Sequence, residues 1–278
     1  MKPSTRVDLH IHTTASDGCW TPEEVVAQVR AAGIGLFAVA DHDTVAGVGP
    51  AAEAARRAGL RFLPAVEVSA RLDGAGLHIL GYGIDPSHPD LARLLEANTA
   101  RLEWVDEEIL RRLARAGHPI DWEAYAAYRY DPSRGGWKAL NYLIDLGICR
   151  DVHDFFKRIY VEPFRPPPPD FPHPAEVAAT IRAAGGVPVL AHPGLSFGRS
   201  GLDEKDLAPF IEFGLAGVEC YSPYNTPEVT RTCLAFCRRW ALVVTGGSDC
   251  HGGFVGRRLG IPPVRLEDLA LGPLLSRL

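Results

Sequence analysis

The stretch VDLHIHTTASDG (residues 7–18) places two histidines at the end of a short apolar segment and an aspartate in the polar segment after it. We predict a strand at Val7–Ile11. Alternate side chains of a strand face the same way, so His10 and His12 are expected to point together. Asp17 is close enough in the chain to fold back beside them. The spacing therefore predicts a shared polar site at this strand end.

Other side chains that bind metals lie at or near the ends of later predicted strands. They are His42, Glu67, His78, His192, Asp249 and His251. In barrel-like α/β folds, the active site is built at the carboxyl ends of the strands. Six histidines and three carboxylates at such positions are poorly explained as separate polar residues of the core. The whole set predicts one metal site, assembled from distant parts of the chain.

Strand and helix patterns alternate outward from the opening stretch. Buried strands are predicted at 36–41, 61–69 and 77–84, and helices at 22–32 and 49–58. A second series, with helices at 174–184 and 226–240 and strands at 187–192, 214–221 and 241–249, follows residue 173. Continuous apolar strands between helices are typical of a parallel sheet with both faces covered. The fold class predicted from this alternation is α/β.

Residues 88–165 interrupt the alternation with helical patterns. Leu102, Val105, Ile109 and Leu113 recur at helical spacing, and two further helices are predicted at 135–147 and 151–160. The proline run at 165–170 is expected to be extended. We therefore predict an inserted helical subdomain over 88–165, while 1–87 and 166–278 together form the α/β part.

Composition limits the classes of partner. The chain has 278 residues, 46% of them hydrophobic, and a net charge of −5, which argues against a broad basic surface for long nucleic acid. The six cysteines form no C-x-x-C pair and are expected to be reduced and structural. Residues 1–10 contain no apolar signal segment, and no run of 18 apolar residues occurs. A cytoplasmic location without a membrane partner is the expectation.

The types of ligand indicate the chemistry of the predicted metal site. Imidazole mixed with carboxylate, without thiolate, argues against a closed structural zinc site and suits Mn²⁺, Fe²⁺ or Zn²⁺. Nine ligands are too many for one ion, so two or three divalent ions are expected, with Glu67 as a bridge. Metals about 3.5–4 Å apart suit a displacement at phosphorus. Asp41 is predicted to orient an imidazole, while Asp43 has either that role or the role of a cap or turn carboxylate.

The motifs DLHIHTTASDG, ADHDT, AVEVS, HILGYGID, LAHPG and GGSDCHG follow one another over residues 8–252. With them the sequence resembles the PHP (polymerase and histidinol phosphatase) superfamily. The resemblance implies a distorted (β/α)7 TIM-like barrel that binds two or three metals. It implies one ion at His10, His12, Glu67 and Asp249, a second at Glu67, His78 and His192, and a third at Asp17, His42 and His251.

The resemblance also implies an enzyme, a metal-dependent phosphoesterase that acts through a metal-activated hydroxide. Asp17, His42, His192 and His251 are the expected catalytic residues. The implied substrates are small phosphorylated molecules, including nucleotides and short oligonucleotide ends, cleaved as monoesters or diesters. One departure concerns specificity, because relatives that act on nucleotides often carry Arg-Pro-His where this chain has Gly136-Trp137-Lys138.

Positive charge is needed to bind a phosphate beside the metals. Arg134 and Lys138, in the insertion, and Arg199, after the predicted strand that ends at His192, are the candidates for substrate binding. Trp137 and Tyr224 are left open between stacking on a substrate ring and packing in a core or lid.

Two alternative functions remain. An amidohydrolase-type barrel also begins with H-x-H, but it usually has a bridging modified lysine, and HILGYGID offers only His78. The other alternative is a non-catalytic metal-binding PHP module, which the complete set of nine ligands disfavours.

Overall fold

The computed structural model describes residues 5–197 and 202–277. Eight strands of these residues form one sheet in the order β7-β6-β5-β4-β3-β2-β1-β8. Their bounds are β1 Arg6–Asp8, β2 Ile34–Val39, β3 Arg61–Leu72, β4 Ala75–Tyr82, β5 Val187–Leu190, β6 Gly217–Tyr221, β7 Val243–Gly246 and β8 Val264–Arg265.

The segment after β1 closes this sheet into a barrel. The amide of Leu9 donates to the carbonyl of Gly246 (3.1 Å), and the amide of His12 donates to the carbonyl of Cys250 (2.9 Å). These bonds join the continuation of β1 to the continuation of β7, at the opposite end of the strand order. The predicted α/β barrel is confirmed. The strand predicted at Val7–Ile11 is shorter than expected, because β1 ends at Asp8 and Ile11 makes only an isolated bridge with Cys250.

The prediction of an all-parallel sheet is wrong at β4. This strand runs antiparallel to both β3 and β5, while the pairs β1–β2, β2–β3, β5–β6 and β6–β7 are parallel. The reason lies in the connection between β3 and β4, which consists of Asp73 and Gly74, both with positive φ. Two residues can join antiparallel strands, but a parallel pair needs a crossover of about a dozen.

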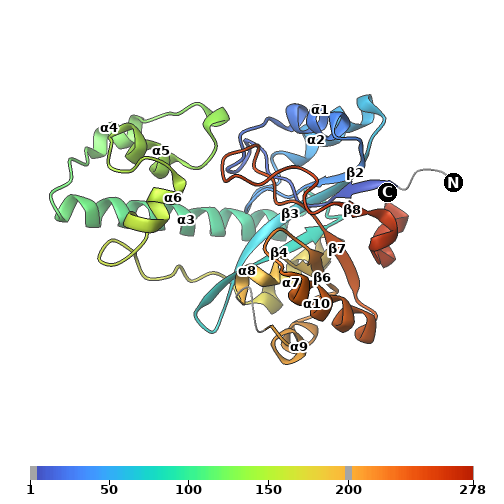
Figure 1. Ribbon diagram of the computed structural model, residues 1–278. Coiled ribbons are helices and arrows are strands. Elements are labelled where there is room, and N and C mark those ends of the chain that lie inside the picture. Colours follow the sequence, from blue (N-terminus) through green and yellow to red (C-terminus); the bar gives the residue numbers. More distant parts are fainter. Residues whose placement is uncertain (1–4, 198–201, 278) are drawn as a thin grey trace.

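Helices cover the outside of the barrel (Figure 1). They are α1 Pro22–Ala31, α2 Val48–Ala58, α7 Pro174–Ala183, α8 Pro193–Ser196, α9 Glu204–Glu212 and α10 Pro227–Trp240, and the 3₁₀ turns η3 Leu266–Asp268 and η4 Gly272–Arg277 follow β8. The start of α1 shows why the chain turns helical there. Thr21 and Glu24 form a capping box, and Pro22 occupies the first turn.

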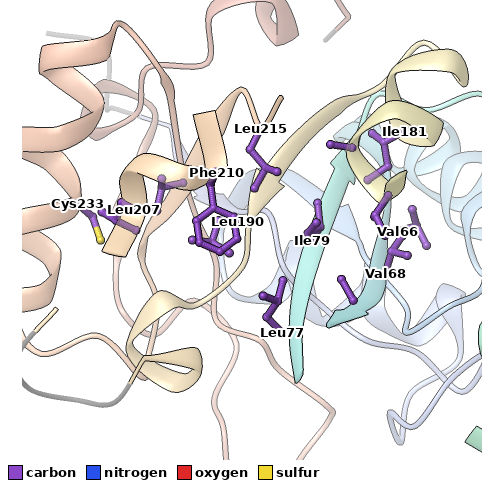
Figure 2. Close-up of a cluster of buried hydrophobic side chains, with 14 of the residues drawn as sticks. Val66, Val68, Leu77, Ile79, Ile181, Leu190, Leu207, Phe210, Leu215 and Cys233 are labelled. Atoms are coloured by element: carbon purple, nitrogen blue, oxygen red, sulfur yellow. The ribbon is translucent and has the colours of Figure 1, made fainter. Parts of the chain in front are cut away.

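The largest core cluster lies between the sheet and the helices α7, α9 and α10. Figure 2 shows Val66, Val68, Leu77, Ile79 and Leu190 of the sheet facing Ile181, Leu207, Phe210 and Cys233 of the helices. The branched and aromatic side chains fill this layer with almost no exposure. This rigid packing holds the strands in place. Of the nine predicted metal ligands, Glu67 and His78 lie within β3 and β4, and the other seven lie in segments that follow strands.

The segment after β4 is helical and extends to one side of the barrel (Figure 1). It contains α3 Pro89–Arg115, α4 Trp122–Ala127, η1 Pro132–Arg134, α5 Lys138–Asp145, α6 Val152–Asp154 and the π-helical η2 Phe155–Ile159. The helix predicted at 151–160 is thus divided in two. These elements share a hydrophobic cluster of their own, in which Ile109 and Leu113 of α3 pack with Leu140 of α5 and Phe155.

The loop between η1 and α5 brings this segment against the barrel. The amide of Gly136 donates to the carbonyl of Asp17 (2.8 Å). Gly135 and Gly136 both have positive φ, and a Cβ on Gly136 would lie 2.8 Å from the ring of Phe254. Glycine is therefore required at this close approach. Among the helices that the structure describes, none is both long and apolar enough to cross a membrane.

Candidate metal centre

Glu67 lies at the middle of the site, fully buried on β3. Its Oε1 atom lies 3.0 Å from Nδ1 of His78 and 2.8 Å from Nε2 of His192. Its Oε2 atom lies 3.1 Å from Nε2 of His10, 3.3 Å from Nε2 of His12 and 3.1 Å from Nδ1 of His42. One carboxylate thus faces five imidazoles from four parts of the chain, as a ligand that bridges metals would.

Asp249 and Asp17 lie on either side of this centre. Oδ1 of Asp249 is 3.0 Å from Nε2 of His12 and 3.6 Å from Nε2 of His10. Oδ1 of Asp17 is 3.2 Å from Nε2 of His251 and 3.6 Å from Nδ1 of His12. The fold therefore brings together all nine residues that the sequence singles out as ligands.

Ligand atoms of eight of these residues form groups small enough to surround an ion. Within each group all atoms lie within 4.8 Å of one another: His12, Asp17, His42 and His251; His10, His12, Glu67 and Asp249; His42, Glu67 and His78. His192 stands beside the third group, with its Nε2 3.4 Å from Nδ1 of His78. Imidazole and carboxylate in this ratio match the donors that Mn²⁺, Fe²⁺ and Zn²⁺ accept.

Several of these atoms are buried without a hydrogen-bond partner among the described residues. They are Nε2 of His10, both ring nitrogens of His12, Oε2 of Glu67 and Oδ1 of Asp249. Buried polar atoms are normally paired, and each exception needs an explanation. Bound cations would satisfy all of these atoms, so the residues present fit a metal centre.

The charges of the cluster lead to the same conclusion. Burial opposes the charge of Glu67, but the imidazoles of His10, His42 and His78 outweigh it and hold its pKa well below the usual value. Burial likewise opposes the charge of His12, but the adjacent carboxylates of Asp249 and Glu67 raise its pKa to about 10. The carboxylates thus stay ionised only with positive charge beside them, which protons or divalent cations supply.

Further carboxylates lie behind the ligands. Glu219 on β6 accepts from Nδ1 of His10 (2.9 Å) and from the amide of His192 (2.9 Å), so it fixes the ring of His10 with Nε2 toward the cluster. Asp8 accepts from the amides of His10, Ser248 and Gly260. Such outer partners orient the ligands of a metal.

The prediction that Asp41 orients an imidazole is wrong. Its oxygens accept from the amide and hydroxyl of Thr13 and from the hydroxyl of Ser16, so it holds the loop after His12 instead. Asp43 accepts from Ser69 and Asn98, which joins β3 to α3. It therefore binds neither an imidazole nor a helix start.

The backbone is also unusual at this site. His192 has φ 24°, Asp249 φ 50° and Asp43 φ 47°, all in the left-handed region that non-glycine residues rarely adopt. Strained backbone positions of this kind cluster at functional sites, where the surrounding structure holds them. The site is thus preorganised by the fold.

Two of the residues predicted to bind substrate have their described contacts inside the insertion. Arg134 donates to both oxygens of Asp145, and Nζ of Lys138 donates to the carbonyl of Ala126 and lies 4.5 Å from the ring centre of Tyr125. Arg199 falls outside the described residues. Trp137 packs against Phe155 in the insertion's core.

Sequence reasoning missed three residues that contact the site. The strand patterns include Glu219 and Asp8 without assigning them a role, although a lone carboxylate within an apolar run such as GVECY is a signal of a buried polar role. Arg257, which donates to Oδ2 of Asp249, gives no comparable signal, because it follows the last motif in a loop.

Known proteins share this chain's sequence and fold. A family model described as PHP domain matches residues 8–143. The chain is 32% identical to a 5′-3′ exoribonuclease of Haemophilus influenzae, over 88% of this chain and 90% of the relative. It is 33% identical to a phosphoribosyl 1,2-cyclic phosphate 1,2-diphosphodiesterase of Eggerthella lenta, over 89% of this chain and 94% of the relative. It is 32% identical to a 3′,5′-nucleoside bisphosphate phosphatase of Chromobacterium violaceum, over 93% of each.

A solved structure extends the similarity to the fold. A protein of Bifidobacterium adolescentis described as a metal-dependent phosphoesterase superposes with a TM-score of 0.78, over 99% of this chain and 96% of that one, at 30% identity. The activities for which these relatives are named differ in substrate, but each is the cleavage of a phosphate ester.

Proposed function

The chain belongs to the PHP family of metal-dependent phosphoesterases, and from this premise we propose that it hydrolyses phosphate esters of nucleotides or of short oligonucleotide ends. Hydrolysis of a phosphate ester is common to the relatives named above, whereas the substrate differs among them. Nucleotide substrates are favoured because two of the three relatives act on nucleoside bisphosphates or RNA by name.

The observation that carries the proposal is the convergence of nine buried or half-buried imidazoles and carboxylates, with Glu67 at their centre. We propose that they hold two or three ions of Mn²⁺, Fe²⁺ or Zn²⁺. The proposed ligands are His10, His12, Asp17, His42, Glu67, His78, His192, Asp249 and His251. When bound, such ions activate water near neutral pH and neutralise charge in a displacement at phosphorus.

The chain's own residues orient this site and admit the substrate. Nδ1 of His251 lies 2.9 Å from the carbonyl of Asp249, which directs Nε2 of His251 toward Asp17. The side chains of Asp17, His42 and His78 are 20%, 26% and 31% exposed, whereas Glu67 is fully buried. The substrate therefore approaches on the side of these three residues. Asp17 and His42, together with His192 and His251, are the proposed catalytic residues.

The proposed role of the helical insertion over 88–165 is to cover this approach. Its Gly136 amide donates to the carbonyl of Asp17, so the insertion contacts the loop that carries a proposed ligand. A cover at this position limits the size of substrate that reaches the centre, in agreement with small molecules and chain ends.

Amidohydrolase chemistry has less support. Among the described residues, the bridging lysine that such barrels usually carry has no counterpart at the strand ends, because Lys138, Lys157 and Lys205 lie in α5, η2 and α9. A purely structural metal module is disfavoured because the relatives are hydrolases by name.

A panel assay tests the proposal. The protein, reloaded with Mn²⁺, Fe²⁺ or Zn²⁺, is offered nucleoside monophosphates, nucleoside 3′,5′-bisphosphates, 5′-phosphorylated di- to tetranucleotides, a cyclic sugar phosphate and a set of amides. We expect release of phosphate or nucleotide, which a chelator abolishes. Asp249→Asn is expected to lose more than about 100-fold in activity, which exceeds the loss typical when an outer partner of a metal ligand is mutated. The exposed control Asp170→Asn is expected to stay active. Cleavage of amides alone, or of nothing by folded, metal-loaded protein, would contradict the proposal.

A further inference from the structure

The metal centre is rich in negative charge. Besides Asp17, Glu67 and Asp249 among the proposed ligands, four buried carboxylates lie behind it, Asp8, Asp41, Asp43 and Glu219. A substrate phosphate adds further negative charge. In a site of this kind, basic side chains beside the metals are needed to attract and orient the phosphate.

One arginine reaches this centre. Within residues 5–197 and 202–277, Arg257 is the only lysine or arginine whose side chain contacts any of the nine proposed ligands. It lies in the loop after β7, six residues beyond His251, and its Nη1 atom donates to Oδ2 of Asp249. The two oxygens of Asp249 thus have different partners, since Oδ1 faces His12 and His10 while Oδ2 faces the arginine.

The guanidinium of Arg257 is held in place by its neighbours but keeps N–H donors available for a ligand. Its central carbon lies 5.1 Å from the ring centre of Tyr224, whose ring in turn lies 5.4 Å from that of His192. A guanidinium has five N–H donors, and among the described residues the bond to Asp249 is the only hydrogen bond that this side chain makes. The side chain is 20% exposed. Donors therefore remain at the edge of the centre, on a side chain that reaches solvent.

We propose that Arg257 is the arginine that binds the substrate's phosphate beside the metals, with Tyr224 as the platform that holds its guanidinium plane. This inference rests on the proposed phosphoesterase function and names the residue that recognises the anion. A planar guanidinium binds two phosphate oxygens at once, which a lysine ammonium does not. Arg134 and Lys138 are less suited, because their described contacts lie within the insertion.

Variants of two adjacent arginines test the inference. We compare Arg257→Ala and Arg257→Lys with Arg258→Ala, whose parent side chain is exposed. For each metal-loaded protein, calorimetry measures the Kd of inorganic phosphate, and elemental analysis measures the bound metal. A hydrogen bond to a charged group contributes about 1.5–3 kcal/mol. We therefore expect Arg257→Ala to raise the Kd of phosphate by at least about tenfold while the metal content stays unchanged. The Kd of Arg257→Lys should lie between those of Arg257→Ala and the parent, and the Kd of Arg258→Ala should equal that of the parent.

Two results would overturn the inference. One is the same phosphate Kd in Arg257→Ala and Arg258→Ala. The other is loss of metal from both Arg257 variants, which would make the arginine only a support for Asp249. Rescue of Arg257→Ala hydrolysis by added guanidinium, with KM rather than kcat restored, would support a substrate contact. The proposed function can fail separately: the parent would then cleave no phosphate ester, while its binding of inorganic phosphate would still depend on Arg257.

Discussion

Glu219 connects two of the proposed ligands from behind, through the ring of His10 and the backbone of His192. It lies on β6, fully buried, and touches neither the approach side nor the proposed arginine. A carboxylate in this place sets which nitrogen of His10 faces the metals and increases its basicity. Its effect should therefore appear in metal affinity.

We expect Glu219→Gln to weaken metal binding by about 10–100-fold, the range typical of lost outer partners. Competition with a chromophoric chelator measures this. The exposed Glu212→Gln serves as the matched control. Equal metal affinities of the two variants would show that Glu219 has no part in the centre.

The residues of the centre differ in how visible they are from sequence. His10 and His12 are predictable, because two-residue spacing at a strand end has one geometric outcome. Glu219 and Arg257 are not, because their roles depend on the partners that the fold places opposite them. The same holds for Asp41, which contacts Thr13 and Ser16 where an imidazole was expected.

At the scale of elements, the loop at Gly135 and Gly136 couples the helical insertion to the centre. Each carries a positive φ and lies against Phe254, so the loop fits only without side chains. The loop before α5 thus sets how closely the insertion approaches Asp17.

Gly136→Ala is expected to loosen this contact. The new Cβ would lie 2.8 Å from Phe254, in addition to the cost of a positive φ. Gly147→Ala has nearly the same φ, 71° against 74°, but open space around its Cβ, so it isolates the backbone cost. We expect faster hydrogen exchange in α5 and lower kcat/KM for Gly136→Ala than for Gly147→Ala. Identical behaviour of the two variants would refute a role for the close approach.

Asp106 of α3 gives the insertion a pH dependence. Burial raises the pKa of this carboxyl to about 8, although a hydrogen bond from Trp137 lowers it and Glu103 and Glu107 raise it further. The ordinary value is 3.8, so the folded state binds the proton more tightly than the unfolded state. The stability from this group is present at low pH and is lost as pH rises toward 8.

Asp106→Asn removes that titration. The difference in Tm, variant minus parent, is expected to be more positive at pH 9 than at pH 5. Glu96→Gln, an exposed position ten residues away on α3, should show no such change between the two pH values. If the difference in Tm between Asp106→Asn and the parent is the same at both pH values, the pKa of Asp106 is not raised.

The elements themselves were mostly predictable. Periodicity and caps place α1, α2 and α10 to within two residues, because local signals such as Thr21 with Glu24 decide them. The direction of β4 was missed, although the Asp73-Gly74 pair between two apolar runs is a hairpin signal. The helix α9 was also missed, since Pro209 within it hides the helical pattern.

At the scale of the whole molecule, the barrel brings together more buried carboxylates than its basic side chains neutralise. Seven carboxylates lie in and around the centre, and two of their oxygens, Oε2 of Glu67 and Oδ1 of Asp249, lack hydrogen-bond partners among the described residues. Ions that bind only the folded state stabilise it, by about 2.7 kcal/mol at 100 times their Kd.

Chelation should therefore lower the Tm of the parent by several degrees, and added Mn²⁺ or Zn²⁺ should restore it. Calorimetry measures both steps. Asp249→Asn, with a ligand removed, is expected to respond less to either step. A parent Tm that is insensitive to chelator, in protein shown to have contained metal, would mean that the ions do not stabilise the fold.

Anomalous diffraction from crystals grown with Mn²⁺ or Zn²⁺ would locate the proposed ions directly. We expect two or three peaks around Glu67, at about 2.0–2.2 Å from its carboxylate oxygens and the nearby imidazole nitrogens. Anomalous peaks only elsewhere on the protein, or a cluster without any peak in metal-saturated crystals, would contradict this expectation.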